Sequence, residues 1–251
     1  MGAFAPYIAV NILMKILLRG KNLLFPGMCV LCGGGLFEPE EIRLGLCLDC
    51  GSSFVPFEGM KCGVCGKPLI SEQGTCLPCR NNPEHSYDRL WVLFPYTGKY
   101  RKLLTAYKFH KNLELASFFA KKINELIACE PLLKDACIVP VPPRPGKIKH
   151  SGWDQVEHLV KKLVKIPVSS LKSEYPVSRC LKRRKSKAQK QLNRTDRLDN
   201  LKDRIYITGA VPKKAVIIDD VITTGSTMEV CARVLKNAGA EDIYGICLFY
   251  D

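Results

Sequence analysis

The chain has 251 residues, a formal net charge of +14 and 13 cysteines. With 47% hydrophobic residues it is neither too short nor too polar to bury a core, and its length accommodates one larger domain with a small additional module. The excess of basic residues favours polyanionic partners.

Residues 1–24 are predicted to form a helical extension. No charged residue precedes Lys15, and the apolar residues of the segment follow helical spacing. The uncharged run is too short to span a bilayer, and it lacks the positive start of a secretory signal. We therefore expect a surface helix and no transmembrane segment. A translation start at Met14 and a weak membrane contact are the alternatives.

Residues 25–82 are predicted to form a double zinc ribbon, because four Cys-x-x-Cys pairs follow one another there. One such pair is weak evidence, but two pairs supply the four thiolates of a closed structural zinc site. We expect the first four cysteines to bind one zinc ion and the last four a second. The predicted ligands are Cys29, Cys32, Cys47, Cys50, Cys62, Cys65, Cys76 and Cys79.

Other uses of these cysteines remain open at this point. The eight ligands can interleave between the two metals, and a disulfide framework is the main alternative to zinc. Thiol-rich metal sites need reduced cysteines, so zinc predicts a cytoplasmic protein. The five isolated cysteines are predicted to fill the core; they are Cys129, Cys137, Cys180, Cys231 and Cys247.

Residues 83–251 are predicted to form the larger domain, in which strands alternate with helices. We expect strands over 87–96, 137–141, 204–207, 214–218 and 243–250. We expect helices over 99–108, 113–127 and 153–163, and a last helix that Gly239 ends. This alternation predicts an α/β fold with a doubly wound, mostly parallel sheet.

In residues 215–227, four apolar residues lead into two acids, which are followed by Val221-Ile222 and a Thr-Thr-Gly-Ser-Thr turn. The apolar run predicts a buried strand that carries the acids at its carboxyl end, where α/β sheets bind ligands. The turn offers hydroxyls and backbone N–H groups at a helix N-terminus, which favours a phosphate, and paired carboxylates suit ribose hydroxyls or a divalent cation. The predicted sugar-phosphate site contains Asp219, Asp220, Thr223, Thr224, Gly225, Ser226 and Thr227. Acids that merely cap a helix are the alternative.

Positive charge is concentrated in residues 144–204, which hold 18 Lys or Arg against 6 Asp or Glu. One interpretation is a basic flexible loop over 180–204 that closes over a pyrophosphate. The other is an electrostatic groove for a nucleic-acid backbone such as single-stranded DNA. No aromatic residue lies between Lys182 and Arg204, so base stacking from this stretch is not indicated.

The motif at 215–227 resembles the phosphoribosyl-pyrophosphate (PRPP) motif of type I phosphoribosyltransferases, and the whole arrangement resembles the ComF family. The resemblance also rests on Tyr107-Lys108-Phe109, on the Pro-Val-Pro end of the strand at 138–142 and on Gly152-Trp153-Asp154-Gln155. A further family pattern is matched by Lys182, Arg184, Ser186, Gln189, Leu192, Arg197 and Asn200.

This resemblance implies a type I phosphoribosyltransferase-like domain that binds PRPP or ribose 5-phosphate with Mg²⁺. It also implies a role in DNA uptake during natural competence, beside a helicase partner at the cytoplasmic face of the membrane. The residues it implies for the pyrophosphate side are Pro142, Arg144, Lys182, Arg184, Gln189 and Arg197.

Two departures from the family pattern concern the anion-facing loop. Ser151 stands where the family has Arg, and Asp154 stands where it has Asn. We expect weaker pyrophosphate binding, unless Arg144, Lys147 or Lys149 compensates.

Three functions follow from these observations: a PRPP-binding protein of DNA uptake, an active phosphoribosyltransferase with an unknown acceptor, and a zinc-ribbon nucleic-acid adaptor with a vestigial sugar site. No titratable group in the core motif identifies a catalytic residue.

Overall fold

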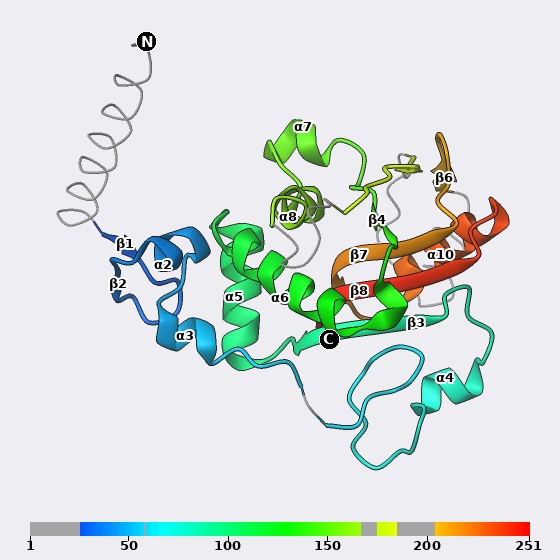
Figure 1. Ribbon diagram of the computed structural model, residues 1–251, viewed down its shortest axis with the longest axis horizontal. Helices are drawn as coiled ribbons and strands as arrows, with labels where there is room; N and C mark the ends of the chain where they lie inside the picture. Colours follow the sequence, from blue (N-terminus) through cyan, green and yellow to red (C-terminus); the bar gives the residue numbers. More distant parts are fainter. Residues whose placement is uncertain (1–25, 58, 167–174, 185–203) are drawn as a thin grey trace, which may run out of the picture.

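The computed structural model describes residues 26–57, 59–166, 175–184 and 204–251. Its centre is a four-stranded sheet with the strand order β3-β8-β7-β4, in which all neighbouring strands are parallel (Figure 1). These strands are β3 (Arg89–Pro95), β4 (Cys137–Pro140), β7 (Lys214–Ile222) and β8 (Asp242–Tyr250). The predicted α/β fold with a mostly parallel sheet is confirmed.

Helices cover both faces of this sheet. On one face pack α5 (Gly98–Phe109), α6 (Leu115–Cys129) and α8 (Gln155–Leu163), and on the other packs α10 (Ser226–Asn237). Successive side chains of β7 alternate between the two cores, with Val216 facing the three helices and Ile217 facing α10. Burial on both faces accounts for the unbroken apolar run in the sequence. Two shorter helices are η1 (Pro131–Leu133) and α7 (Lys147–Ser151).

The first ribbon packs against α5 and α6, beside which it lies in Figure 1. It consists of the antiparallel pair β1 (Gly27–Met28) and β2 (Gly35–Leu36), followed by α2 (Pro39–Leu44) and α3 (Leu48–Ser52). Phe54 follows α3, is completely buried, and makes edge-on ring contacts with Phe94, Tyr100 and Phe118. These rings join the ribbon to the main core.

The second ribbon, which ends in α4 (Leu77–Asn81), packs against the edge strand β3 (Figure 1). The backbone N–H of Leu90 donates a hydrogen bond of 2.8 Å to the Val64 carbonyl. Gly66 has φ of +69° and approaches the strand so closely that a Cβ would lie 2.5 Å from the Leu90 carbonyl oxygen. The ribbon therefore partly covers the free edge of the sheet.

A small antiparallel sheet of β5 (Leu181–Arg183) and β6 (Ile205–Ile207) lies beside α10. Its register pairs Lys182 with Tyr206. The predicted loop over 180–204 thus begins with a strand. Three residues are too few for an alternation of apolar and polar side chains to indicate it.

Two further details differ from the sequence-based prediction. The strand expected at 214–218 continues to Ile222, so both acids lie within β7. Of the isolated cysteines, three are buried as predicted, but Cys129 is exposed at the end of α6 and Cys137 is half-buried. These two cysteines are therefore not core residues.

Some predictions concern parts of the chain that the structure does not describe. The extension at 1–24 and the candidate residues Gln189 and Arg197 lie outside the described residues. The domain limits after residues 24 and 82 stay predictions. Within the described ranges, no helix has both the length and the apolar character needed to cross a bilayer.

Candidate functional site

The eight predicted metal ligands form two clusters, each with its sulfur atoms within 4.8 Å of one another. The Sγ atoms of Cys32 and Cys47 are 3.8 Å apart, and those of Cys65 and Cys76 are 3.6 Å apart. Tetrahedral zinc with Zn–S bonds of about 2.3 Å needs sulfurs about 3.8 Å apart. Both clusters therefore fit structural zinc, and they group the first four and the last four cysteines as predicted, without interleaving.

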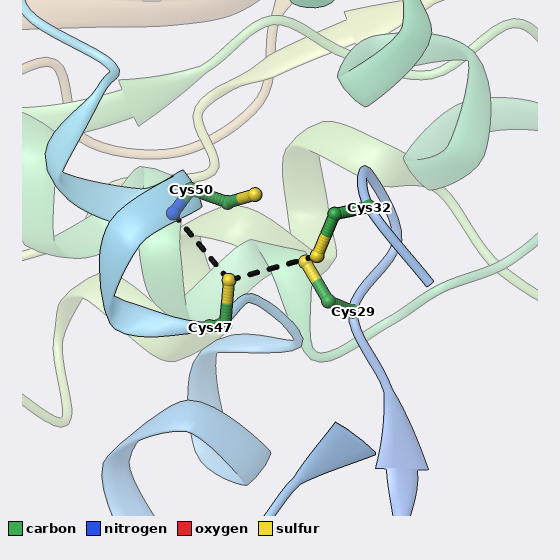
Figure 2. A group of neighbouring side chains, drawn as sticks. All are labelled: Cys29, Cys32, Cys47 and Cys50. Carbon is green, nitrogen blue, oxygen red and sulfur yellow. Dashed lines mark hydrogen bonds between the residues drawn. The ribbon is translucent and has the colours of Figure 1, made fainter. Parts of the chain in front are cut away.

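Figure 2 shows how short local elements build the first cluster. Cys29 and Cys32 come from the turn between β1 and β2, and Cys47 and Cys50 come from the start of α3. The Cys50 N–H donates to Cys47 Sγ at 3.4 Å. All four side chains converge on one point, which is the arrangement that a closed metal site requires.

The second cluster has the same chemistry in a more buried setting. All four of its cysteines are buried, and the Cys76 N–H donates to Cys62 Sγ at 3.4 Å. Burial alone would raise the pKa of Cys62, but the surrounding backbone N–H groups lower it to about 7. Donors that stabilise a thiolate also prepare it to bind zinc.

The predicted phosphate-binding turn, residues 223–227, joins β7 to α10. Gly225 has φ of +76° at the N-cap, a left-handed conformation that favours glycine. The Thr224 and Ser226 hydroxyls lie 2.8 Å apart, and Thr223 and Thr224 are exposed. The turn therefore presents hydroxyls and the N–H groups of the first helical turn at the start of a twelve-residue helix.

The two acids of the motif have different surroundings. Asp219 lines a cavity of ≈ 40 Å³ together with all five residues of the turn, whereas Asp220 does not line it. Asp220 instead pairs with Lys108 Nζ at 3.0 Å and accepts a hydrogen bond of 2.6 Å from the Gln155 amide. The structure thus brings Asp219 and the turn together and anchors Asp220 to α5 and α8.

The environment of Asp219 disfavours its charge. Burial and the neighbouring Asp220 carboxylate raise the pKa of Asp219 well above its ordinary value, while the Asp220 N–H and Lys108 act in the opposite direction. That N–H donates to Asp219 Oδ1 at 2.8 Å. A carboxylate held in this way gains from any cation or hydroxyl donor that enters the cavity.

Asp154, a departure from the family pattern, has a structural partner. It caps α8 by accepting from the N–H groups of Val156 and Glu157, and it pairs with Lys147 Nζ at 2.7 Å. Lys147 also contacts the Gln155 side chain. The negative charge of Asp154 is therefore balanced locally, and Lys147 is occupied in balancing it.

Four of the predicted pyrophosphate-side residues lie in the described part of the chain, and two of them, Lys182 and Arg184, lie in and directly after β5 of the small sheet. Lys182 and Arg184 are exposed, and Arg184 lies over the Tyr206 ring at 4.9 Å. Arg183 lies between them at the end of the strand, so its side chain is on the opposite face, and it is half-buried. Burial and the charge of Arg144 lower the pKa of Arg183, and Asp219 opposes this change. Sequence reasoning missed Arg183. The alternation of β5 would have indicated it, had that strand been recognised.

The other two described residues of that group lie near the end of β4. Pro142 is buried just beyond the strand, and Arg144 is exposed two residues later. The Val141 N–H donates to the Ile218 carbonyl at 3.0 Å, which keeps this segment beside β7. Besides burial, Arg144 lowers the pKa of Arg183 and Asp219 raises it, so these three charges influence one another.

Two family models match the chain, each over one part of it. Residues 21–80 match the double zinc ribbon domain, and residues 152–251 match the phosphoribosyl transferase domain. These matches agree with the two cysteine clusters and with the parallel sheet that carries the turn.

The chain is also similar to competence proteins over most of its length. It is 28% identical to competence protein ComFC of Streptococcus pneumoniae over 233 residues, which cover 92% of this chain and 97% of that protein. It is 27% identical to competence protein F of Haemophilus influenzae over 227 residues, 86% of this chain and 93% of that protein. It is 28% identical to the DNA utilization protein YhgH of Escherichia coli over 236 residues, 90% of this chain and 98% of that protein.

Proposed function

We propose, from the premise that the chain is a ComF-family homologue with double zinc ribbon and phosphoribosyl transferase domains, that it binds PRPP or ribose 5-phosphate. The observation that carries the proposal is the cavity shared by Asp219 and the turn at 223–227. A carboxylate for ribose hydroxyls and a set of N–H and hydroxyl donors for a phosphate lie in one place, as this ligand requires.

Each part of the site has a distinct task in this proposal. The turn holds the 5-phosphate through its N–H groups and the hydroxyls of Thr223 and Thr224. Asp219 accepts from the ribose, and Asp220 is held in place by Lys108 and Gln155. Mg²⁺ bound with PRPP would offset the charge of the pyrophosphate, and the carboxylates of β7 are the ligands that this ion prefers.

Arg183 replaces Lys182 and Arg184 as the residue proposed to face the pyrophosphate. The charges of Arg144 and Asp219 both affect the pKa of Arg183. Its two neighbours, in contrast, are exposed on the other face of β5. An arginine can bind phosphate oxygens through two parallel hydrogen bonds and keeps its charge when buried.

Titration calorimetry with PRPP and with ribose 5-phosphate, with and without Mg²⁺, tests the binding site. We expect the wild-type chain to bind both ligands. Thr224→Ala should weaken the binding of both ligands by roughly tenfold or more, because one hydrogen bond to a charged group is worth about 1.5–3 kcal/mol. Arg183→Ala should weaken PRPP much more than ribose 5-phosphate. Absence of binding by the zinc-loaded wild type would contradict the proposal.

Transferase activity is a separate question with a separate measurement. Single-turnover release of pyrophosphate from PRPP, with Mg²⁺ and a panel of bases, distinguishes an enzyme from a binding protein. Release with one base and not with the others would identify the acceptor. Binding without release under all conditions would favour a sensor or adaptor that uses PRPP as a ligand.

Single-stranded nucleic acid is a second candidate ligand, favoured by the outer face of the small sheet. Lys182 pairs with Tyr206 across the two strands, Arg184 lies over the same ring, and all three are exposed. Positive charge beside an aromatic ring is the usual surface for an unpaired strand. The relatives named for competence and DNA utilization support a DNA-related role.

A salt series tests this second ligand. For single strands, log K falls with log salt by about 0.7 per neutralised phosphate, so Lys182→Ala with Arg184→Ala should reduce the slope by roughly 1.4. Lys213→Ala, at an exposed lysine outside this face, is the control. An unchanged slope in the double variant would exclude the surface.

A further inference from the structure

A second cavity, of ≈ 210 Å³, lies between the second cysteine cluster and the phosphate-binding turn. One wall contains Cys65, Cys76 and Cys79, and the opposite wall contains Thr223 to Ser226. The predicted zinc site and the predicted phosphate site therefore border one cavity, although about 150 residues separate them in the sequence.

Glu229 connects the two walls. It lies in the first turn of α10, one helical turn after Gly225, and its N–H donates to the Gly225 carbonyl at 2.9 Å. Its carboxylate accepts hydrogen bonds of 2.6 Å from the Ser86 hydroxyl and 3.2 Å from the Ser86 N–H, and it lies 3.7 Å from His85 Nδ1. The start of α10 is thus attached to the segment that leaves the second ribbon.

That segment is in turn fixed by the second ribbon. Tyr87 is buried and stacks on His85, with ring centroids 5.0 Å apart. Three residues later, the Leu90 N–H donates its hydrogen bond to the carbonyl of Val64, which lies between the predicted ligands Cys62 and Cys65. A continuous set of contacts therefore runs from the cysteine cluster through Ser86 to the turn.

The first cluster has no such connection among the described residues. None of its four cysteines lines either cavity at the turn, and its ribbon packs against α5 and α6 instead. The two metals are therefore expected to differ in their effect on the sugar-phosphate site. The first cluster serves as an internal control for the second.

We propose that zinc in the second cluster, acting through Glu229, sets the affinity of the turn for a 5-phosphate, whereas zinc in the first cluster does not. The proposal rests on the proposed function, since it concerns the same site. Without metal the second ribbon loses the energy that orders it, so Ser86 and His85 are released and Glu229 loses its partners. The turn must then be ordered at the expense of ligand affinity.

Thermodynamic linkage supplies the test. If zinc strengthens ribose 5-phosphate binding, ribose 5-phosphate must strengthen zinc binding at the same cluster by the same factor. Zinc affinities of the full chain are measured in metal-buffered competition with a chelator, with and without ribose 5-phosphate. Cys47→Ser and Cys76→Ser assign the two sites. We expect about a tenfold rise in affinity at the second cluster and none at the first.

Glu229→Gln tests the route of this coupling, with Glu241→Gln at an exposed glutamate beyond α10 as its control. We expect the Glu229 variant to keep two zinc ions while its coupling falls to less than about threefold and its ribose 5-phosphate affinity drops about fivefold. The control should match the wild type. Since Gln keeps the size of Glu, a purely steric role would leave the coupling unchanged.

The outcomes separate this inference from the proposed function. Ribose 5-phosphate binding with no change in zinc affinity, or with equal changes at both clusters, overturns the inference and leaves the proposed function intact. Full coupling in Glu229→Gln overturns the role of Glu229. Failure of the zinc-loaded wild type to bind ribose 5-phosphate overturns the proposed function and this inference with it. If Cys76→Ser does not fold, Cys47→Ser still decides the matter, because it keeps the second cluster as the one complete four-cysteine site of the two.

Discussion

The two cysteine clusters share one ligand set and one local design but differ in what surrounds them. In the first, Cys32 is exposed and Cys47 and Cys50 are half-buried, whereas in the second all four cysteines are buried. The first ribbon is joined to helices through an aromatic ring, and the second is joined to a strand edge and shares a cavity with the turn at 223–227. Identical local chemistry can therefore serve different roles, because the tertiary neighbours decide what each metal supports.

Phe54→Ala should give the largest effect, because it removes the ring that joins the first ribbon to the core. Phe54 is completely buried, and loss of a buried Phe side chain typically lowers the free energy of unfolding by about 3–5 kcal/mol. We expect a clear fall in Tm of the zinc-loaded chain and faster proteolysis of the first ribbon. Val55→Ala, at the exposed neighbouring residue, should leave both unchanged. Equal effects would mean that the first ribbon is not anchored by Phe54.

Gly66→Ala and Gly33→Ala compare equivalent positions, each directly after the second cysteine of a Cys-x-x-Cys pair. Both glycines have positive φ, which costs another residue about 1–2 kcal/mol. Only at Gly66 would the added Cβ also meet backbone, the Leu90 carbonyl; at Gly33 nothing lies within 4 Å. Thermal unfolding should show a loss at Gly66 at least about twice that at Gly33. Equal losses would contradict the close docking of the second ribbon.

Asp219→Asn tests how much the charge of Asp219, in the predicted sugar-phosphate site, lowers the stability of the domain. Since the folded pKa of Asp219 is raised, its ionised form destabilises the fold at high pH, and this cost disappears as pH falls towards the ordinary value of 3.8. The variant should therefore gain about 1 kcal/mol over the wild type at neutral pH and above, and progressively less in acid.

Urea unfolding at several pH values measures this difference, and calorimetry should show that the same variant binds ribose 5-phosphate poorly. A gain in stability that grows as pH falls would contradict the sign derived for Asp219.

Lys121→Ala should have the smallest effect. Lys121 on α6 pairs with Glu40 on α2 at 2.8 Å, but both side chains are nearly half exposed, so solvent screens the pair. We expect no measurable shift of Tm and no change in zinc content. A large shift would show that polar contacts, rather than Phe54, fix the first ribbon.

Much of this architecture could be predicted from the sequence because its signals are local. The spacing of the cysteines indicated both clusters and their membership. Apolar periodicity indicated the main strands and helices, and the motif at 215–227 indicated the turn before α10. These features depend on residues that are close in the chain, where spacing and backbone geometry leave few alternatives.

Other features escaped because they depend on pairing and packing between distant segments. The strand containing Arg183 is recognisable only beside Tyr206 and its neighbours, so the sequence pointed to Lys182 and Arg184 and not to the half-buried Arg183. The different surroundings of Asp219 and Asp220 likewise depend on which helix covers each face of β7.

The sequence by itself predicted two four-thiolate clusters and a mostly parallel sheet with a turn at 223–227 after its last acids, since each follows from the order of neighbouring residues. Only the tertiary structure decided that the second cluster borders the turn and that Ser86 holds Glu229. The reason is physical: contacts between segments so far apart are selected by the burial of the whole core, and no local pattern records them.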